Sequence, residues 1–159
     1  PEIINLHCAV EHVFKLASAE VPEHIHLVRD YDPSIPDIVF DKDQLIQAVL
    51  NITRNAIEAI GGEPGVVTLR TRVLRHYNLG NVRHPLIAQI SIIDTGPGIP
   101  ESLQSEVFFP MVTTKDTGTG LGLSITQSIV QHNKGLVKFT SRPGNTCFEI
   151  LVPITEANA

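Results

Sequence analysis

The chain has 159 residues, with 12 Lys and Arg against 17 Asp and Glu, so its formal net charge is -5. Its composition of 42% hydrophobic and 18% charged residues excludes a disordered chain, and the length suits one domain with a sizeable core. The acidic balance and the lack of long apolar runs argue against nucleic-acid and membrane partners. With only Cys8 and Cys147, we expect a reduced, cytoplasmic protein. Because it begins with Pro1 rather than Met, we expect a part of a longer protein.

The first half of the sequence predicts a helix, a strand and a second helix. Apolar residues recur at helical spacing from Asn5 to about Glu20, with Asn5 as a suitable N-cap and Pro22 just after the end. A short alternating strand, Ile25–Tyr31, leads to the turn signal Asp32-Pro33. A capping-box pattern then begins a helix from Asp41 to Ile60, which two glycines end.

The second half predicts mostly strands. Two β-rich runs, Val66–Leu74 and Leu86–Asp94, are joined by the polar stretch Arg75–Pro85, which we interpret as a long hairpin connection. The remaining segments are a turn at Thr95–Pro100, a short helix or turn at Glu101–Phe109, a polar loop at Pro110–Thr119, a helix at Gly120–His132, and strands at Leu136–Ser141 and Thr146–Pro153. This order predicts an α/β (α+β) two-layer sandwich, a mixed sheet with helices on one face.

Asn51 and Asn55 lie one turn apart in the expected helix Asp41–Ile60, beside its apolar stripe. Asn costs about 0.5–0.7 kcal/mol relative to Ala inside a helix, so two of them suggest a role. Amide oxygens are ligands that Mg²⁺ accepts, often together with substrate phosphates. The alternative is that both side chains simply face solvent.

A turn of sequence Asp94-Thr95-Gly96-Pro97-Gly98-Ile99-Pro100 follows the apolar run Ile90–Ile93. A carboxylate at the end of a buried strand can accept a hydrogen bond from an exocyclic amine such as that of adenine. The glycines let the backbone approach a flat ring closely. An ordinary strand-end turn favours the same residue types, so that alternative stays open.

A second glycine motif, Gly118-Thr119-Gly120-Leu121-Gly122-Leu123-Ser124, lies where a polar loop leads into a helix. Free backbone N–H groups and the helix dipole make such a place an anion site. A Rossmann fingerprint is excluded because Leu123 stands where its third glycine is required, and the chain has no Walker A motif. The preceding Thr113–Thr117, which contains Lys115, is typical of a lid over phosphates or of a solvated surface loop.

Together and in this order, these motifs resemble the catalytic ATP-binding domain of sensor histidine kinases, within the GHKL superfamily. The matching boxes are the N box (Asn51–Ala56), the G1 box (Asp94–Gly98), the F box (Phe108-Phe109), the G2 box (Gly118–Gly122) and a closing G-x-T-x-F strand (Gly144–Phe148). The resemblance implies the Bergerat sandwich, a mixed, mainly antiparallel sheet with about three helices on one face. The segments Arg29–Pro36 and Phe108–Val112 are most similar to the nitrogen-regulation kinases of the NtrB type.

The resemblance also implies ATP as substrate, Mg²⁺ as cofactor, and a role for each residue of the motifs. Asp94 would bind the adenine amino group, supported by Thr146 through water, and Gly96 and Gly98 would shape the pocket, with Ile99 part of the same site. Asn55 would ligate Mg²⁺, and Asn51 would contact the metal or the phosphates. The triphosphate side of the site would comprise residues of the lid and the second glycine motif: Lys115, Gly118, Thr119, Gly120, Leu121 and Gly122.

By this resemblance, residues 1–159 are a single catalytic domain that transfers the γ-phosphoryl group of ATP to a histidine on a separate dimerisation domain. An NtrC-like response regulator and a PII-like signal protein would be further partners. None of the seven histidines has a phosphoacceptor context, so that domain and the sensor are expected upstream. A hydrolytic relative of gyrase, Hsp90 or MutL would need Glu, a general base for water, where Asn51 stands. A docking module without catalysis is the third possibility.

Overall fold

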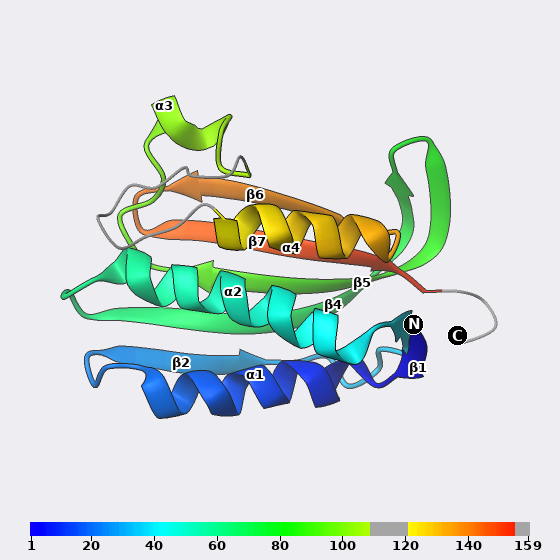
Figure 1. The fold of residues 1–159 in the computed structure, drawn as a ribbon, viewed down its shortest axis with the longest axis horizontal. Helices are drawn as coiled ribbons and strands as arrows, with labels where there is room; N and C mark the ends of the chain where they lie inside the picture. Colours follow the sequence, from blue (N-terminus) through cyan, green and yellow to red (C-terminus); the bar gives the residue numbers. More distant parts are fainter. Residues whose placement is uncertain (109–120, 155–159) are drawn as a thin grey trace.

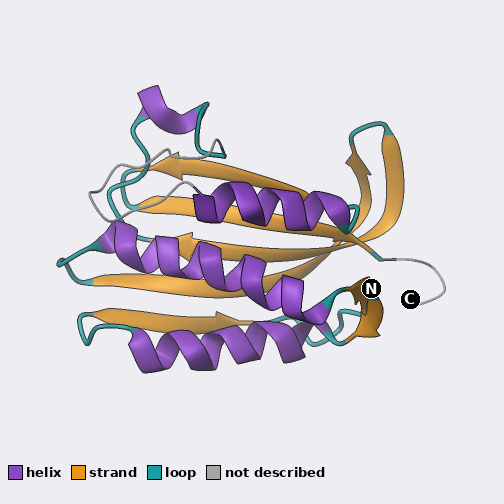
Figure 2. Cartoon of the chain, in the orientation of Figure 1, coloured by secondary structure: helices purple, strands orange, loops and turns teal. Residues whose placement is uncertain are grey.

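The computed structural model describes residues 1–108 and 121–154. The helices and strands in that part of the chain follow one another in the order β1 (Glu2–Ile4), α1 (Leu6–Glu20), β2 (Ile25–Asp30), β3 (Ile38–Phe40), α2 (Lys42–Ile60), β4 (Gly65–Leu79), β5 (Val82–Asp94), α3 (Glu101–Gln104), α4 (Leu121–His132), β6 (Leu136–Arg142) and β7 (Asn145–Pro153). Figure 2 shows the helices in purple, lying over the orange strands of the sheet.

The main sheet has five strands in the order β2-β4-β5-β7-β6. β2 runs parallel to β4, and every other neighbouring pair is antiparallel. Three helices, α1, α2 and α4, lie side by side on one face of this sheet, and the short α3 stands apart from them (Figure 1). The expected two-layer sandwich with a mainly antiparallel sheet is therefore confirmed.

The long helices begin where the sequence predicts, because their N-caps bind the first free amides. The Asn5 side chain accepts a hydrogen bond from the His7 amide at 2.9 Å. The Asp41 side chain accepts one from the Gln44 amide at 3.0 Å. α2 ends at Gly61, whose φ of 68° is accessible to glycine at no steric cost.

The core lies between the sheet and the inner faces of the helices. The residues of α2 that are buried in this core are Leu45, Ala48, Val49, Ile52, Thr53, Ala56 and Ile60. They meet inward-facing residues of the central strands such as Leu69, Ile90 and Ile150. Complete burial of one such aliphatic side chain contributes roughly 1.5–3 kcal/mol, so this seam holds α2 in place on the sheet.

The interpretation of Arg75–Pro85 as a connection was wrong, because β4 and β5 extend through most of it. Their ladder continues to the pair Leu79↔Val82, with a turn at Gly80. The projecting hairpin is visible beside the sheet in Figure 1. Its residues are largely solvent-exposed, so no apolar alternation marks the strands, and backbone pairing extends them. The two-stranded sheet of β1 and β3 was not predicted either, since each strand has only three residues.

The other predicted elements agree with the structure to within one or two residues, apart from the segment 101–109. There the described helix is the single turn α3 (Glu101–Gln104). Phe109 and the expected loop Pro110–Thr119 lie outside the described residues. Among residues 1–108 and 121–154, no helix combines the length and apolar character needed to cross a membrane.

His7 connects the start of α1 to the sheet. Its Nε2 shares a hydrogen bond of 2.8 Å with the hydroxyl of the fully buried Thr71, and its ring centroid lies 5.1 Å from that of Tyr31. Burial lowers the pKa of His7 below its ordinary value, against a smaller opposite effect of the Asp32 carboxylate. The folded state therefore favours the neutral imidazole.

We expect Gly135→Ala to lower the free energy of unfolding by about 1–3 kcal/mol, because there is no room for the added methyl group. A Cβ at Gly135 would lie 2.5 Å from the Leu151 carbonyl oxygen and 2.8 Å from Val130 Cγ1. Gly62→Ala is the matched control, since a Cβ there meets nothing within 4 Å. Urea unfolding measures both variants, and equal stabilities would contradict the tight packing of Gly135 against β7 and α4.

We expect the stability of the chain to decrease as the pH falls below 6.5, the ordinary pKa of histidine, in part because of His7. The folded pKa is the lower one, so the unfolded state binds more protons in this range and the free energy of unfolding rises with pH. His7→Gln should reduce the difference in urea stability between about pH 7.5 and about pH 5. His12→Gln, at an exposed position of the same helix, should leave it unchanged; equal changes in both variants would refute the assignment to His7.

Candidate functional site

Asp94 is the last residue of β5, the strand that lies between β4 and β7 in the middle of the sheet. Its side chain is 3% exposed, and its Oδ1 accepts a hydrogen bond of 2.9 Å from the Gly96 amide. In the strand ladders its partners are Val67 and Thr146. The predicted strand-end carboxylate is thus buried and held in one orientation by the turn that follows it.

The turn after Asp94 runs close to the backbone of other elements, and this explains two of its glycines. A Cβ at Gly96 would lie 2.9 Å from Asp94 Oδ1 and 3.4 Å from the Ala59 carbonyl group of α2. Gly98 has φ +86°, and a Cβ there would lie 3.0 Å from the Arg142 carbonyl group. A side chain at either position would move the turn away from α2 or from the β6–β7 hairpin.

Thr146 and Ser141 form a hydroxyl pair directly beside this turn. Thr146 is 2% exposed, and its Oγ1 lies 2.7 Å from Ser141 Oγ. The Ile99 amide donates a hydrogen bond of 2.8 Å to the same Ser141 hydroxyl. Ser141 is not among the site residues predicted from the sequence. The signal was present, because the turn at 142–145 pairs Ser141 with Thr146 across the hairpin.

Asn51 and Asn55 are partly buried on α2, next to its core face. The residues around them are engaged elsewhere: the Thr53 hydroxyl donates to the Val49 carbonyl oxygen, and Arg54 forms an ion pair of 2.7 Å with Glu20 of α1. The Asn55 Nδ2 atom is buried and has no hydrogen-bond partner within residues 1–108 and 121–154. Burying a polar group without a partner costs about 1–3 kcal/mol, so this N–H donor needs an acceptor from outside those residues.

α4 lies beside α2, and the end at which it begins is near the C-terminal half of α2 (Figure 1). Leu121 and Gly122 are its first residues, so its positive dipole end is on the side of Asn55 and the Asp94 turn. The other predicted residues of this region, Lys115, Gly118, Thr119 and Gly120, lie outside the described part of the chain.

Phe108, the first residue of the F-box match, is anchored in an aromatic cluster. Its ring meets Phe139 of β6 and Phe148 of β7 edge-on, at centroid distances of 5.9 and 6.3 Å. Phe139 and Phe148 stack on each other at 5.2 Å. These contacts fix the chain just before residue 109 against the two last strands.

A hollow of about 670 Å³ lies between Ala59, the segment 97–101 and the segment 141–143. Its lining includes two charged residues, Glu101 and Arg142. Asp94 and Asn55 do not line it. The hollow therefore borders the Asp94 turn on its outer side, against the β6–β7 hairpin.

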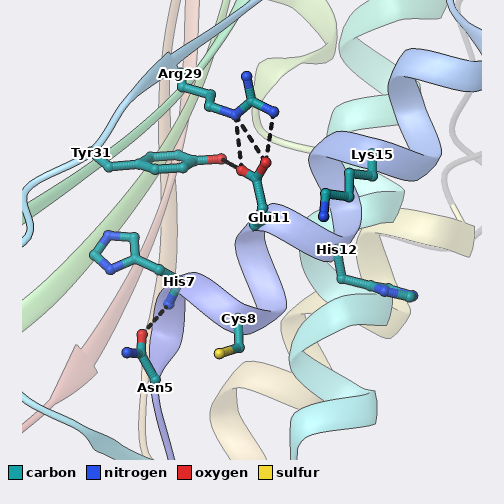
Figure 3. A pocket seen from close by; sticks show the side chains of 8 residues that line it. All are labelled: Asn5, His7, Cys8, Glu11, His12, Lys15, Arg29 and Tyr31. Carbon is teal, nitrogen blue, oxygen red and sulfur yellow. Dashed lines mark hydrogen bonds and ion pairs between the residues drawn. The ribbon is translucent and has the colours of Figure 1, made fainter.

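A second hollow, of about 650 Å³, lies between α1 and β2, at the opposite end of the sheet from Asp94 (Figures 1 and 3). Its central groups are paired with one another. Glu11 accepts hydrogen bonds from Arg29 at 2.6–3.0 Å and from the Tyr31 hydroxyl at 3.0 Å, and the Arg29 bonds lower the pKa of Glu11. Burial and the bond to Glu11 raise the pKa of Tyr31. We interpret this network as structural support of the sheet edge.

Known histidine kinases are similar to this chain over most of its length. The family model described as "Histidine kinase-, DNA gyrase B-, and HSP90-like ATPase" matches residues 40–156. The chain is 49% identical over 150 residues to the sensory histidine kinase/phosphatase NtrB of Klebsiella oxytoca, and 39% identical over 156 residues to that of Rhodobacter capsulatus. These matches cover 94% and 95% of the chain but 43% of each relative, so the chain spans less than half of their length.

Solved structures agree with the fold. The catalytic domain of the histidine kinase ThkA is 27% identical, with a TM-score of 0.81 and full coverage of both chains. Full-length ShkA in complex with AMPPNP is 25% identical, with a TM-score of 0.81, 99% coverage of this chain and 32% of its own. The resemblance to kinase catalytic domains of the NtrB type is thereby confirmed. With residues 40–156 matched and the expected sandwich present, the chain belongs to the family of histidine kinase-, DNA gyrase B- and HSP90-like ATPases.

Proposed function

We propose that this chain is the catalytic ATP-binding domain of a two-component sensor histidine kinase of the NtrB type. The observation that carries the proposal is the buried Asp94 carboxylate, fixed by the Gly96 amide at the end of β5 and one strand away from Thr146. A buried acceptor beside a glycine turn suits an adenine amino group. The likeness to ShkA, whose structure contains AMPPNP, supports an adenine nucleotide as the ligand.

In this proposal Asp94 accepts the hydrogen bond of the adenine amino group, and Thr146 supports it from the neighbouring strand. Gly96 and Gly98 keep the turn close to α2 and to the β6–β7 hairpin, and Ile99 belongs to the same wall. The triphosphate extends toward the start of α4, where Leu121 and Gly122 follow Gly118, Thr119 and Gly120 in sequence. Lys115 adds a positive charge in the expected lid.

The residues on α2 fit a divalent cation held between protein and phosphates. The Asn55 side chain carries the neutral amide oxygen that Mg²⁺ accepts, and its buried Nδ2 atom, which has no partner within residues 1–108 and 121–154, can donate to a phosphate oxygen. Asn51, one turn earlier, would contact the same metal or the phosphates. Bound Mg²⁺ neutralises phosphate charge, which is the main requirement of phosphoryl transfer together with positioning.

The side chain at position 51 favours transfer to another protein over hydrolysis. A hydrolytic site needs a general base to activate water, and the Asn51 amide cannot accept a proton usefully at neutral pH. The γ-phosphoryl group would instead pass to a histidine on a separate dimerisation domain. An NtrC-like response regulator would then receive it, and a PII-like protein would regulate the kinase.

We expect ADP to bind to the chain and Asp94→Asn to weaken this binding by about 100-fold, because a buried charged acceptor is lost. Asn55→Ala should bind ADP but lose the dependence of its affinity on Mg²⁺. Calorimetric titration with and without Mg²⁺ measures both effects. Asp43→Asn and Asn81→Ala are matched controls at exposed positions away from the site. A folded chain that binds no ADP would contradict the proposal and favour a docking module.

With ATP and Mg²⁺, we expect the chain to transfer label to a separately produced dimerisation domain of the Klebsiella oxytoca relative, and none to itself. The reason is that none of its own histidines has a phosphoacceptor context. Labelling by [γ-³²P]ATP followed by gel separation measures the transfer, and Asp94→Asn should abolish it. Rapid release of inorganic phosphate by the chain alone would instead favour the hydrolytic reading.

A further inference from the structure

The turn after Asp94 is bonded to Val66 of β4 at its first residue, Thr95, and to the β6–β7 hairpin from Gly96 onward. The Gly96 carbonyl oxygen accepts a hydrogen bond of 2.8 Å from the Gly144 amide. The Gly98 backbone passes so close to the Arg142 carbonyl that a Cβ would be 3.0 Å away. At the far end, the Ile99 amide donates to Ser141 Oγ at 2.8 Å. From Gly96 onward, the position of the turn therefore depends in part on the hairpin.

Ser141 differs from the other contacts because its hydroxyl serves two parts of the site at once. One lone pair of Oγ is taken by the Ile99 amide, and the hydroxyl also hydrogen-bonds Thr146 Oγ1 at 2.7 Å. Thr146 is the ladder partner of Asp94. The serine thus links the Gly98–Ile99 segment of the turn to the residue that stands opposite the buried carboxylate.

We propose that Ser141 is a positioning residue for nucleotide binding. Its hydroxyl holds the turn and Thr146 in register with Asp94, so that the groups facing the adenine are already in place before binding. This inference rests on the function proposed above, and Ser141 acts through Ile99 and Thr146 rather than by touching the nucleotide. Its contribution belongs to the adenine side of the site and would be independent of the metal proposed to bind at Asn55.

Calorimetric titration of the 159-residue chain with ADP tests this, using Ser141→Ala and Ser141→Thr. Loss of a hydroxyl that makes two hydrogen bonds should weaken binding about three- to tenfold. The weakening should be the same with and without Mg²⁺, unlike that of Asn55→Ala. Ser141→Thr retains the hydroxyl and should bind within about twofold of the unchanged chain. Thr140→Ala, at an exposed neighbouring position on β6, is the control and should bind normally.

If Ser141 had only a structural role, Ser141→Ala would have a lower thermal midpoint. The folded variant, measured well below that midpoint, would still bind ADP with unchanged affinity. If Ser141→Ala does not fold, Ser141→Cys, with its weaker hydrogen-bonding thiol, carries the same expectation. Unchanged affinity in these variants, or an equal loss in Ser141→Thr, would overturn the role of Ser141 alone. Failure of the unchanged chain to bind ADP would overturn the proposed function and this inference together.

Discussion

Asp94 and Thr146 stand opposite each other at the end of the β5–β7 ladder, and the arrangement of the whole site depends on this pairing. β5 carries the turn with the two closely packed glycines, whereas β7 and its hairpin partner β6 supply the wall against which the turn rests. The pair Ile90↔Ile150 lies within the buried core of the same ladder. The hydrophobic effect that holds the two strands together therefore also sets the geometry of the polar groups at their end.

α2 contributes to the core and to the site with two adjacent faces. Its apolar stripe is buried against the sheet, and this fixes the rotation of the helix about its axis. Once that rotation is fixed, Asn51 and Asn55 necessarily lie together on the neighbouring face. The buried Nδ2 atom of Asn55, without a partner in the described part of the chain, is a local cost that the core packing of the same helix offsets.

Polar side chains at the two ends of the sheet have different kinds of hydrogen-bond partner. At the α1–β2 edge, the carboxylate of Glu11 meets both a guanidinium and a phenol, so the charged groups at the centre of that hollow satisfy one another. At the Asp94 end, backbone amides of the turn donate hydrogen bonds to the polar side chains, to the Asp94 carboxylate and to the Ser141 hydroxyl. These bonds fix the shape of the turn. A preorganised surface of this kind reduces the ordering cost of binding a small ligand.

The sequence by itself determined the helices, most of the strands and the residues of the G1 box and N box. Their signals are local: caps such as Asn5 and Asp41, apolar periodicity, and glycines at tight turns act within a few residues. It did not determine the outer part of the β4–β5 hairpin or the β1–β3 sheet, because exposed or three-residue strands carry no hydrophobic pattern. Only the tertiary structure decided that Ser141 reaches Ile99 and Thr146, and that Phe108 meets Phe139 and Phe148. Such contacts join segments that are separated in sequence, so they exist only once the sheet has paired.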